Sequence, residues 1–155
     1  MTQISTQTAL TKSAALRGET VRAVLVGPGS MTRIDFGDET VVVGGKTRAP
    51  WQLMVWGAAW RIENEVRVLL TSESTVTELG AMHEILVGQR VERLTLEQPS
   101  FSLDVGFDSG LSLRTFALWM DADDDNWMLF MPDGDVVSSA GTQLRLDAES
   151  ASDRS

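Results

Sequence analysis

Apolar residues recur at helical spacing over one stretch in the second half of the chain. The stripe consists of Val76, Leu79, Met82, His83, Ile85 and Leu86. Thr75 stands three residues before Glu78, a spacing typical of a capping box, in which each side chain bonds the other residue's backbone amide. Gly88 follows the stripe, where a glycine in the left-handed conformation often ends a helix. The pattern therefore predicts an amphipathic helix over 75–86, followed by strands that begin near Val91.

The same order of features occurs earlier, with a weaker helix over 8–16 that ends at Gly18. The segments LRGETVRAVLV (16–26) and LVGQRVERLTL (86–96) align without a gap, glycine on glycine and valine on valine. Three further segment pairs continue the alignment: 32–36 with 103–107, 40–42 with 111–113, and 51–53 with 127–129. The chain therefore reads as two diverged copies of one unit, about 8–70 and 74–146.

Turn signals separate the alternating segments. Gly27–Ser30 corresponds to Gln98–Ser100, Gly37–Glu39 corresponds to Asp108–Gly110, and Pro132–Gly134 is a further hairpin signal. We expect a strand-rich α+β fold made of two helix-plus-antiparallel-meander repeats with approximate internal two-fold symmetry. A single domain is expected over 1–146, and the small polar stretch 147–155 is predicted to be a disordered tail.

The second copy resembles a family of small, mainly actinobacterial proteins of unknown function. The shared pattern is L-x-G-x-x-V, then F-(D/G)-x-G-x-x-L, then W-x-L-x-x-P-x-G. It is carried here by Leu86, Gly88, Val91, Phe107, Asp108, Gly110, Leu113, Trp127, Leu129, Pro132 and Gly134. The first copy matches loosely, with Glu39 in place of the hairpin glycine, and Ser138–Gly141 stands where such proteins often carry Pro-Gly-Gly. The resemblance implies a fold and carries over no catalytic residues.

Composition and charge narrow the classes of function. The 155 residues contain no cysteine, which excludes disulfides, thiolate nucleophiles and iron–sulfur clusters. The net charge is −9, and residues 104–155 hold three arginines against eleven acidic residues. Without a basic cluster, we expect no nucleic-acid partner, and the charge opposes anionic membranes. The start of the chain, MTQISTQTALT, does not resemble a secretory signal, so we expect a cytoplasmic protein.

Five tryptophans and no tyrosine make the aromatic residues unusual. Trp51 aligns with Trp127 in the repeat, which indicates core positions, whereas Trp56, Trp60 and Trp119 have no repeat partner. Trp51 and Trp56 are five residues apart on one predicted strand, so Trp56 is expected to face outward if Trp51 faces the core. The simpler interpretation is that other parts of the chain cover Trp56. The alternative is that Trp56, Trp60 and Trp119 form an interaction surface, because exposed tryptophans are frequent in binding hot spots.

The evidence for a catalytic or metal site is weaker than the evidence for an interaction surface. His83 is the only imidazole and lies on or beside the predicted apolar stripe, which favours a packed or surface histidine over a catalytic base. Asp121, Asp123 and Asp125 match the first positions of a calcium loop, but Asn126 and Pro132 replace its glycine and its glutamate. They are candidate ligands for a weak cation site, beside the simpler interpretation of a solvated connection. The sequence predicts no catalytic residues, no metal site of a known type and no cofactor.

The sequence therefore favours a non-enzymatic binding or assembly module, whose partner is another protein or a second copy of the chain. A more specific form is an immunity-type inhibitor whose acidic surface blocks a cationic toxin. An alternative of another class is a small hydrolase or cation-dependent enzyme that uses Asp121–Asp125 with His83, which requires these residues to converge. A carrier of a small ligand in a cavity lined by tryptophan is the third possibility.

Overall fold

Pairing is antiparallel throughout the residues described by the computed structural model, which are 2–121 and 123–149. One sheet has seven strands in the order β1-β14-β13-β12-β6-β3-β2, a second has the order β8-β7-β11-β10-β9, and β4 and β5 form a separate hairpin. The strands are β1 (Thr2–Ile4), β2 (Val21–Val26), β3 (Thr32–Phe36), β4 (Val41–Val43), β5 (Lys46–Arg48), β6 (Trp51–Val55), β7 (Ala58–Glu63), β8 (Val68–Thr71), β9 (Val91–Leu96), β10 (Leu103–Phe107), β11 (Ser112–Ala117), β12 (Asp125–Phe130), β13 (Asp135–Ala140) and β14 (Gln143–Ala148). The helices are α1 (Thr6–Ser13), α2 (Val76–Leu79) and α3 (Met82–Leu86), with 3-10 turns η1 (Ala14–Leu16) and η2 (Pro28–Ser30).

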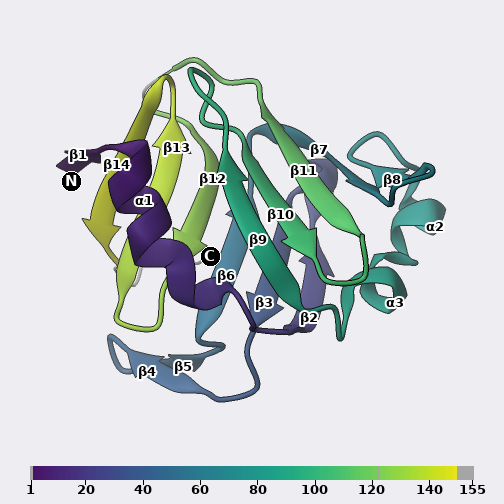
Figure 1. Cartoon of the computed structure of the whole chain (residues 1–155), viewed down its shortest axis with the longest axis horizontal. Coiled ribbons are helices and arrows are strands. Elements are labelled where there is room, and N and C mark those ends of the chain that lie inside the picture. Colours follow the sequence, from purple (N-terminus) through teal and green to yellow (C-terminus); the bar gives the residue numbers. More distant parts are fainter. Residues whose placement is uncertain (1, 122, 150–155) are drawn as a thin grey trace.

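The two large sheets share one hydrophobic core. Their inward-facing side chains include Ile34 and Leu53 of the seven-stranded sheet and Val105, Leu113 and Ile62 of the five-stranded sheet, all fully buried or nearly so. In Figure 1 the strands β9, β10 and β11 lie in front of β2, β3 and β6. Helix α1 packs on β9, and α3 packs on β2. The structure is thus strand-rich and antiparallel with short helices, which confirms the predicted α+β class.

The two sheets are built with the same strand register. The pairs of β2 with β3 are Val21 with Phe36, Ala23 with Asp35, Val24 with Ile34, Leu25 with Arg33 and Val26 with Thr32. The pairs of β9 with β10 are Val91 with Phe107, Arg93 with Gly106, Leu94 with Val105, Thr95 with Asp104 and Leu96 with Leu103. Both registers shift at the same place, so that Arg22 and Glu92 are skipped. These pairs match the sequence alignment of the copies residue by residue.

The later segment pairs of that alignment are wrong. Leu53 of β6 pairs with Ile34, and Leu113 of β11 pairs with Val105. Because Ile34 and Val105 are aligned positions, β6 rather than β4 corresponds to β11. Strands β6 and β12 are neighbours in one sheet, with Leu53 opposite Leu129, so 51–53 and 127–129 are not equivalent segments. The β4–β5 hairpin lies between β3 and β6, whereas β11 follows β10 directly. This difference in length changes the sequence offset between the aligned segments.

The predicted capping box is present. The Thr75 hydroxyl accepts from the Glu78 amide at 3.2 Å, and the Glu78 carboxylate accepts from the Thr75 amide at 2.8 Å. The bond from the Thr75 backbone amide is the main cause that holds the pKa of Glu78 below its usual range. The helix itself is not continuous as predicted. The Gly80 amide is shared between the carbonyls of Val76 and Thr77, and the Ala81 amide bonds to the carbonyl of Glu78, three residues back. This tighter pattern ends α2 before α3 begins.

The start of the disordered tail, predicted at residue 147, is wrong. Residues 147–148 belong to β14, which pairs with both β13 and β1. Glu149 pairs with Arg48, whose guanidinium is buried and also donates to the carbonyls of Ala49, Pro50 and Met131. Glu149, a polar residue of the predicted tail, is thus held in place by the buried Arg48 of β5. The rest of the predicted tail, 150–155, lies outside the described residues.

Candidate functional site

The three tryptophans predicted to form a surface do not share one environment. Trp60 on β7 is only 2% exposed and is part of the core, so the prediction is wrong for this residue. Trp60 pairs with Thr115 of β11, and Trp127 pairs with Val55 at the equivalent position of β6. Trp60 therefore corresponds to Trp127, and both indoles fill the core between the sheets. The sequence alignment missed this because of the β4–β5 hairpin.

The other two tryptophans are exposed at one end of the molecule. Trp56 follows β6 and is 46% exposed, and Trp119 follows β11 and is 39% exposed. Leu118 and Met120, on either side of Trp119, are 61% and 63% exposed. The connection from β11 to β12 runs along the top of Figure 1. We call these four apolar residues the apolar tip.

One buried residue holds both segments of the apolar tip, through its side chain and its backbone carbonyl. Asn126 has no exposed surface, and its side-chain oxygen accepts from the amides of Leu118 and Trp119 at 3.1 and 3.0 Å. Its side-chain nitrogen donates to the Trp119 carbonyl at 3.0 Å. Its backbone carbonyl accepts from the amides of Trp56 and Gly57 at 3.0 and 3.2 Å. The backbones of both exposed tryptophans are thus held by Asn126, a role that the sequence alone did not suggest.

The ring of Trp119 lies directly against Gly57. A Cβ atom added to Gly57 would come within 2.5 Å of the Trp119 ring and 3.0 Å of the Asp125 carbonyl. Gly57 does not have a positive φ, so its backbone conformation would accept other residues. The close approach of the indole is the reason that this position suits glycine. Because Gly57 directly follows Trp56 in the chain, its contact with the indole of Trp119 sets the position of Trp119 relative to Trp56.

The acidic loop predicted as a weak cation site continues directly from the apolar tip. Asp121 accepts from the Asp123 amide through its side chain at 2.9 Å, and its carbonyl accepts from the Asp124 amide at 3.3 Å. The carboxylates of Asp123 and Asp124 are exposed and make no hydrogen bond or ion pair with any described residue. Among residues 2–121 and 123–149, no three acidic or histidine side chains come together as a metal site would require. The structure therefore gives no support to a cation site at Asp121, Asp123 and Asp125, which stays a prediction.

His83 does not join this loop. It is an exposed residue of α3, which packs on β2. In Figure 1, α3 lies at the lower right, far from the β11–β12 connection at the top. The enzyme hypothesis requires His83 and Asp121–Asp125 to converge, and the structure separates them.

Comparisons with known proteins found no matching family model, no matching curated protein and no matching solved structure. The resemblance to a family of actinobacterial proteins therefore stays a prediction. Within the described part of the chain, every helix is too short or too polar to cross a bilayer. The apolar tip and its acidic neighbours are the feature on which a function can be argued.

Proposed function

We propose that the chain is a protein-binding module whose apolar tip binds a basic segment of a partner protein. The observation that carries this proposal is the pair of exposed indoles, Trp56 and Trp119, fixed by Asn126 beside the unpaired carboxylates of Asp123 and Asp124. Rigid aromatic residues lose little conformational entropy on binding and are frequent anchors of interfaces. Arginine and lysine suit such a surface, because they bind carboxylates and also stack on indole rings.

The charge around the apolar tip favours a foreign partner over a second copy of the chain. Two copies that met through this surface would bring Asp121, Asp123 and Asp124 of one molecule close to the same residues of the other. Like charges at an interface oppose association. A partner with basic and aliphatic side chains has the opposite charge and covers the same apolar area. An inhibitor of a cationic toxin, the more specific form of the prediction, is one case of this arrangement.

The first test uses a synthetic peptide in which arginine alternates with leucine, with its affinity measured by fluorescence anisotropy. We expect the purified chain to bind it, and Trp56→Ser or Trp119→Ser to weaken binding about tenfold or more. Asp123→Asn combined with Asp124→Asn should weaken binding several-fold at low salt and much less at high salt, because salt screens exposed charges. Light scattering should show a monomer.

Matched variants keep this test specific. Val66→Ser removes an apolar side chain that is 90% exposed far from the apolar tip, and Glu39→Gln removes an exposed carboxylate from the β3–β4 connection. Both should bind like the wild type. Lack of binding by the wild type, or equal losses in these controls, would contradict the proposal. A dimer that Trp56→Ser converts into a folded monomer would instead assign the apolar tip to self-association.

We also propose that the two copies are related by an approximate two-fold axis near Thr20 and Arg90, which form a β-bridge. Four hydrogen bonds support this relation because they form reciprocal pairs. Gly18 donates to the Val91 carbonyl and Gly88 to the Val21 carbonyl, while Val21 donates to the Gln89 carbonyl and Val91 to the Glu19 carbonyl. Strand exchange supports it too, since β7 of the first copy joins the sheet of the second and β12 of the second joins the sheet of the first.

A further inference from the structure

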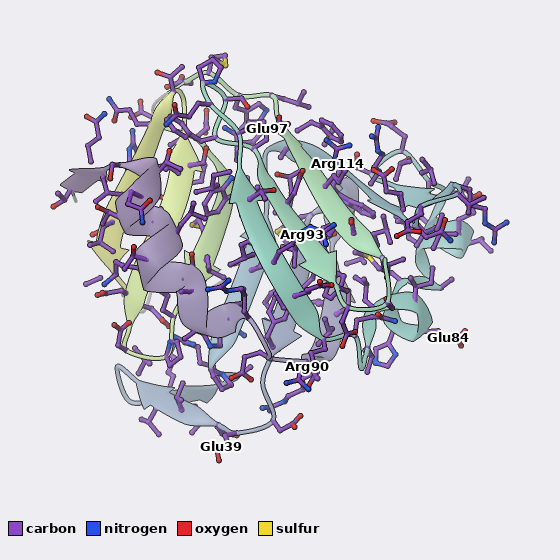
Figure 2. The ribbon with its side chains drawn as sticks, viewed as in Figure 1. Glu39, Glu84, Arg90, Arg93, Glu97 and Arg114 are labelled. Carbon is purple, nitrogen blue, oxygen red and sulfur yellow. The ribbon has the colours of Figure 1, made fainter. Side chains whose placement is uncertain are left out.

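A polar hollow of about 600 Å³ lies on the outer face of the five-stranded sheet. Its floor consists of small residues at the centre of the sheet, Gly106 on β10 and Ser112 on β11, which lie opposite each other. Arg93 on β9 and Arg114 on β11 stand on either side of β10, as Figure 2 shows. This hollow is separate from the apolar tip and does not depend on the function proposed above.

The guanidinium of Arg93 lies across Gly106. A Cβ atom added to Gly106 would come within 2.6 Å of Cζ and 2.8 Å of Nε of Arg93. Gly106 does not have a positive φ, so the strand conformation does not require glycine there. A glycine inside a strand costs stability and often marks a place where another group approaches closely. Here it makes room for Arg93, which forms no hydrogen bond or ion pair with any described residue.

The charged side chains of the hollow divide into paired and unpaired groups. Nε of Arg114 lies 3.2 Å from Oδ2 of Asp104, and Nη1 of Arg114 lies 3.8 Å from Oε1 of Glu63. The unpaired acidic side chains that line the hollow are those of Glu65, Glu92 and Asp108, which are exposed and have no partner among the described residues. One guanidinium and three carboxylates are therefore available to a ligand. Their charges complement a molecule that carries one carboxylate and more than one cationic group.

The fold does not need these residues. At the corresponding places of the seven-stranded sheet, Ala23 replaces Arg93 and Asp35 replaces Gly106, yet the register is the same. The combination of an unpaired arginine with the glycine beneath it therefore belongs to one sheet only.

We propose that this hollow binds a basic amino acid, free or at the C-terminus of a polypeptide. The ligand's carboxylate pairs with Arg93 above Gly106, and its cationic groups face Glu65, Glu92 and Asp108. A charge-assisted pair between a guanidinium and a carboxylate is among the stronger polar contacts at a surface.

The test titrates the full chain with L-lysine, followed by NMR chemical shifts of backbone amides. Cadaverine has the same diamine without the carboxylate, and hexanoate has a carboxylate without the amines. We expect L-lysine to shift the amides of β9, β10 and β11 and to bind about tenfold more tightly than either probe. Nα-acetyl-L-lysine distinguishes the two sources of ligand: equal binding indicates a polypeptide end, and loss of binding indicates the free amino acid.

Variants then assign the contacts. Arg93→Gln should weaken L-lysine binding about tenfold and leave cadaverine binding unchanged. Gly106→Ala should have the same effect, because the added methyl group displaces the guanidinium. Arg17→Gln is the matched control, since this exposed arginine at the end of η1 does not line the hollow. The proposal would be overturned if neither L-lysine nor Nα-acetyl-L-lysine bound, if L-lysine bound no more tightly than cadaverine, or if folded Arg93→Gln kept full affinity.

Discussion

The outer faces of the two large sheets differ although their strands pair in the same register. On the five-stranded sheet, adjacent outward positions hold Arg93, Gly106, Ser112 and Glu63, followed by Thr95, Asp104, Arg114 and Arg61. On the seven-stranded sheet, the corresponding positions hold Ala23, Asp35, Gln52 and Phe130, followed by Leu25, Arg33, Met54 and Met128. One face is largely charged and hollowed, and the other carries a second apolar cluster of Met54, Phe130 and Val136.

This difference shows which residues determine the pairing. The inward-facing residues are mostly apolar in both sheets, with buried exceptions such as Thr32 and Thr115. They fix the register, because a slip by one residue would turn the whole apolar set outward. Outward-facing residues are free of this constraint. They can differ between the sheets without changing the backbone, and on one sheet they form a charged surface suited to a polar ligand.

The sharpest test of this comparison exchanges a large side chain on each outer face for alanine. Phe130 is fully buried, so Phe130→Ala should lower the free energy of unfolding by about 3–5 kcal/mol. Glu63 occupies the corresponding position and is half-buried in an ion pair with Arg61, so Glu63→Ala should cost about 1 kcal/mol or less. Urea denaturation measures both. Equal losses would show that the two outer faces contribute alike.

A second test concerns the β4–β5 hairpin, which lies between β3 and β6 and has no counterpart between β10 and β11. Arg48→Met should cost about 3–5 kcal/mol, because it removes the guanidinium that is paired with the buried carboxylate of Glu149. The double variant Arg48→Met with Glu149→Gln should recover part of this loss. If the single variant unfolds at the wild-type urea concentration, the buried ion pair does not anchor the end of β14.

A smaller effect on stability is expected at Gly106, on the charged outer face of the five-stranded sheet. Gly106→Ala should change the free energy of unfolding by about 1 kcal/mol or less, because alanine favours an extended strand while Arg93 must move. Gly57→Ala provides the contrast, since the indole of Trp119 and the Asp125 carbonyl leave less room than a flexible arginine. Denaturation should therefore show a larger loss for Gly57→Ala.

The smallest effect is a pH dependence within the charged face. Burial raises the pKa of Asp104 above its usual range, and this outweighs the lowering by Arg114. Because the folded state then binds the proton more tightly than the unfolded state, this residue stabilises the fold as pH falls from above its folded pKa towards its unfolded pKa. Side-chain NMR titration should show a higher pKa in Arg114→Gln and a lower one in Glu97→Gln, since Glu97 raises it. Shifts in the opposite directions would contradict this account.

Local patterns of the sequence predicted local structure well. Thr75 and Glu78 form the expected capping box, and Gly18 and Gly88 have the expected positive φ. The alignments of 16–26 with 86–96 and of 32–36 with 103–107 agree with the matching registers of β2 with β3 and of β9 with β10. These features depend on residues close in the chain, so their spacing is enough to predict them.

Contacts between distant segments were not predictable in the same way. The correspondence of Trp60 with Trp127 depends on which strand of one copy joins the sheet of the other. The role of Asn126 depends on two turns that meet only after both sheets have formed. Of the predicted surface, Trp56 and Trp119 are exposed and Trp60 is not, because exposure depends on what packs over a residue.

The strand-rich class and the helix caps follow from the amino-acid sequence, because hydrophobic period and turn chemistry act over a few residues. The exchange of β7 and β12 between sheets, the apolar tip and the place of Arg93 over Gly106 were decided by tertiary structure alone. Each of these depends on residues tens of positions apart, whose meeting follows from burying both apolar faces in one core.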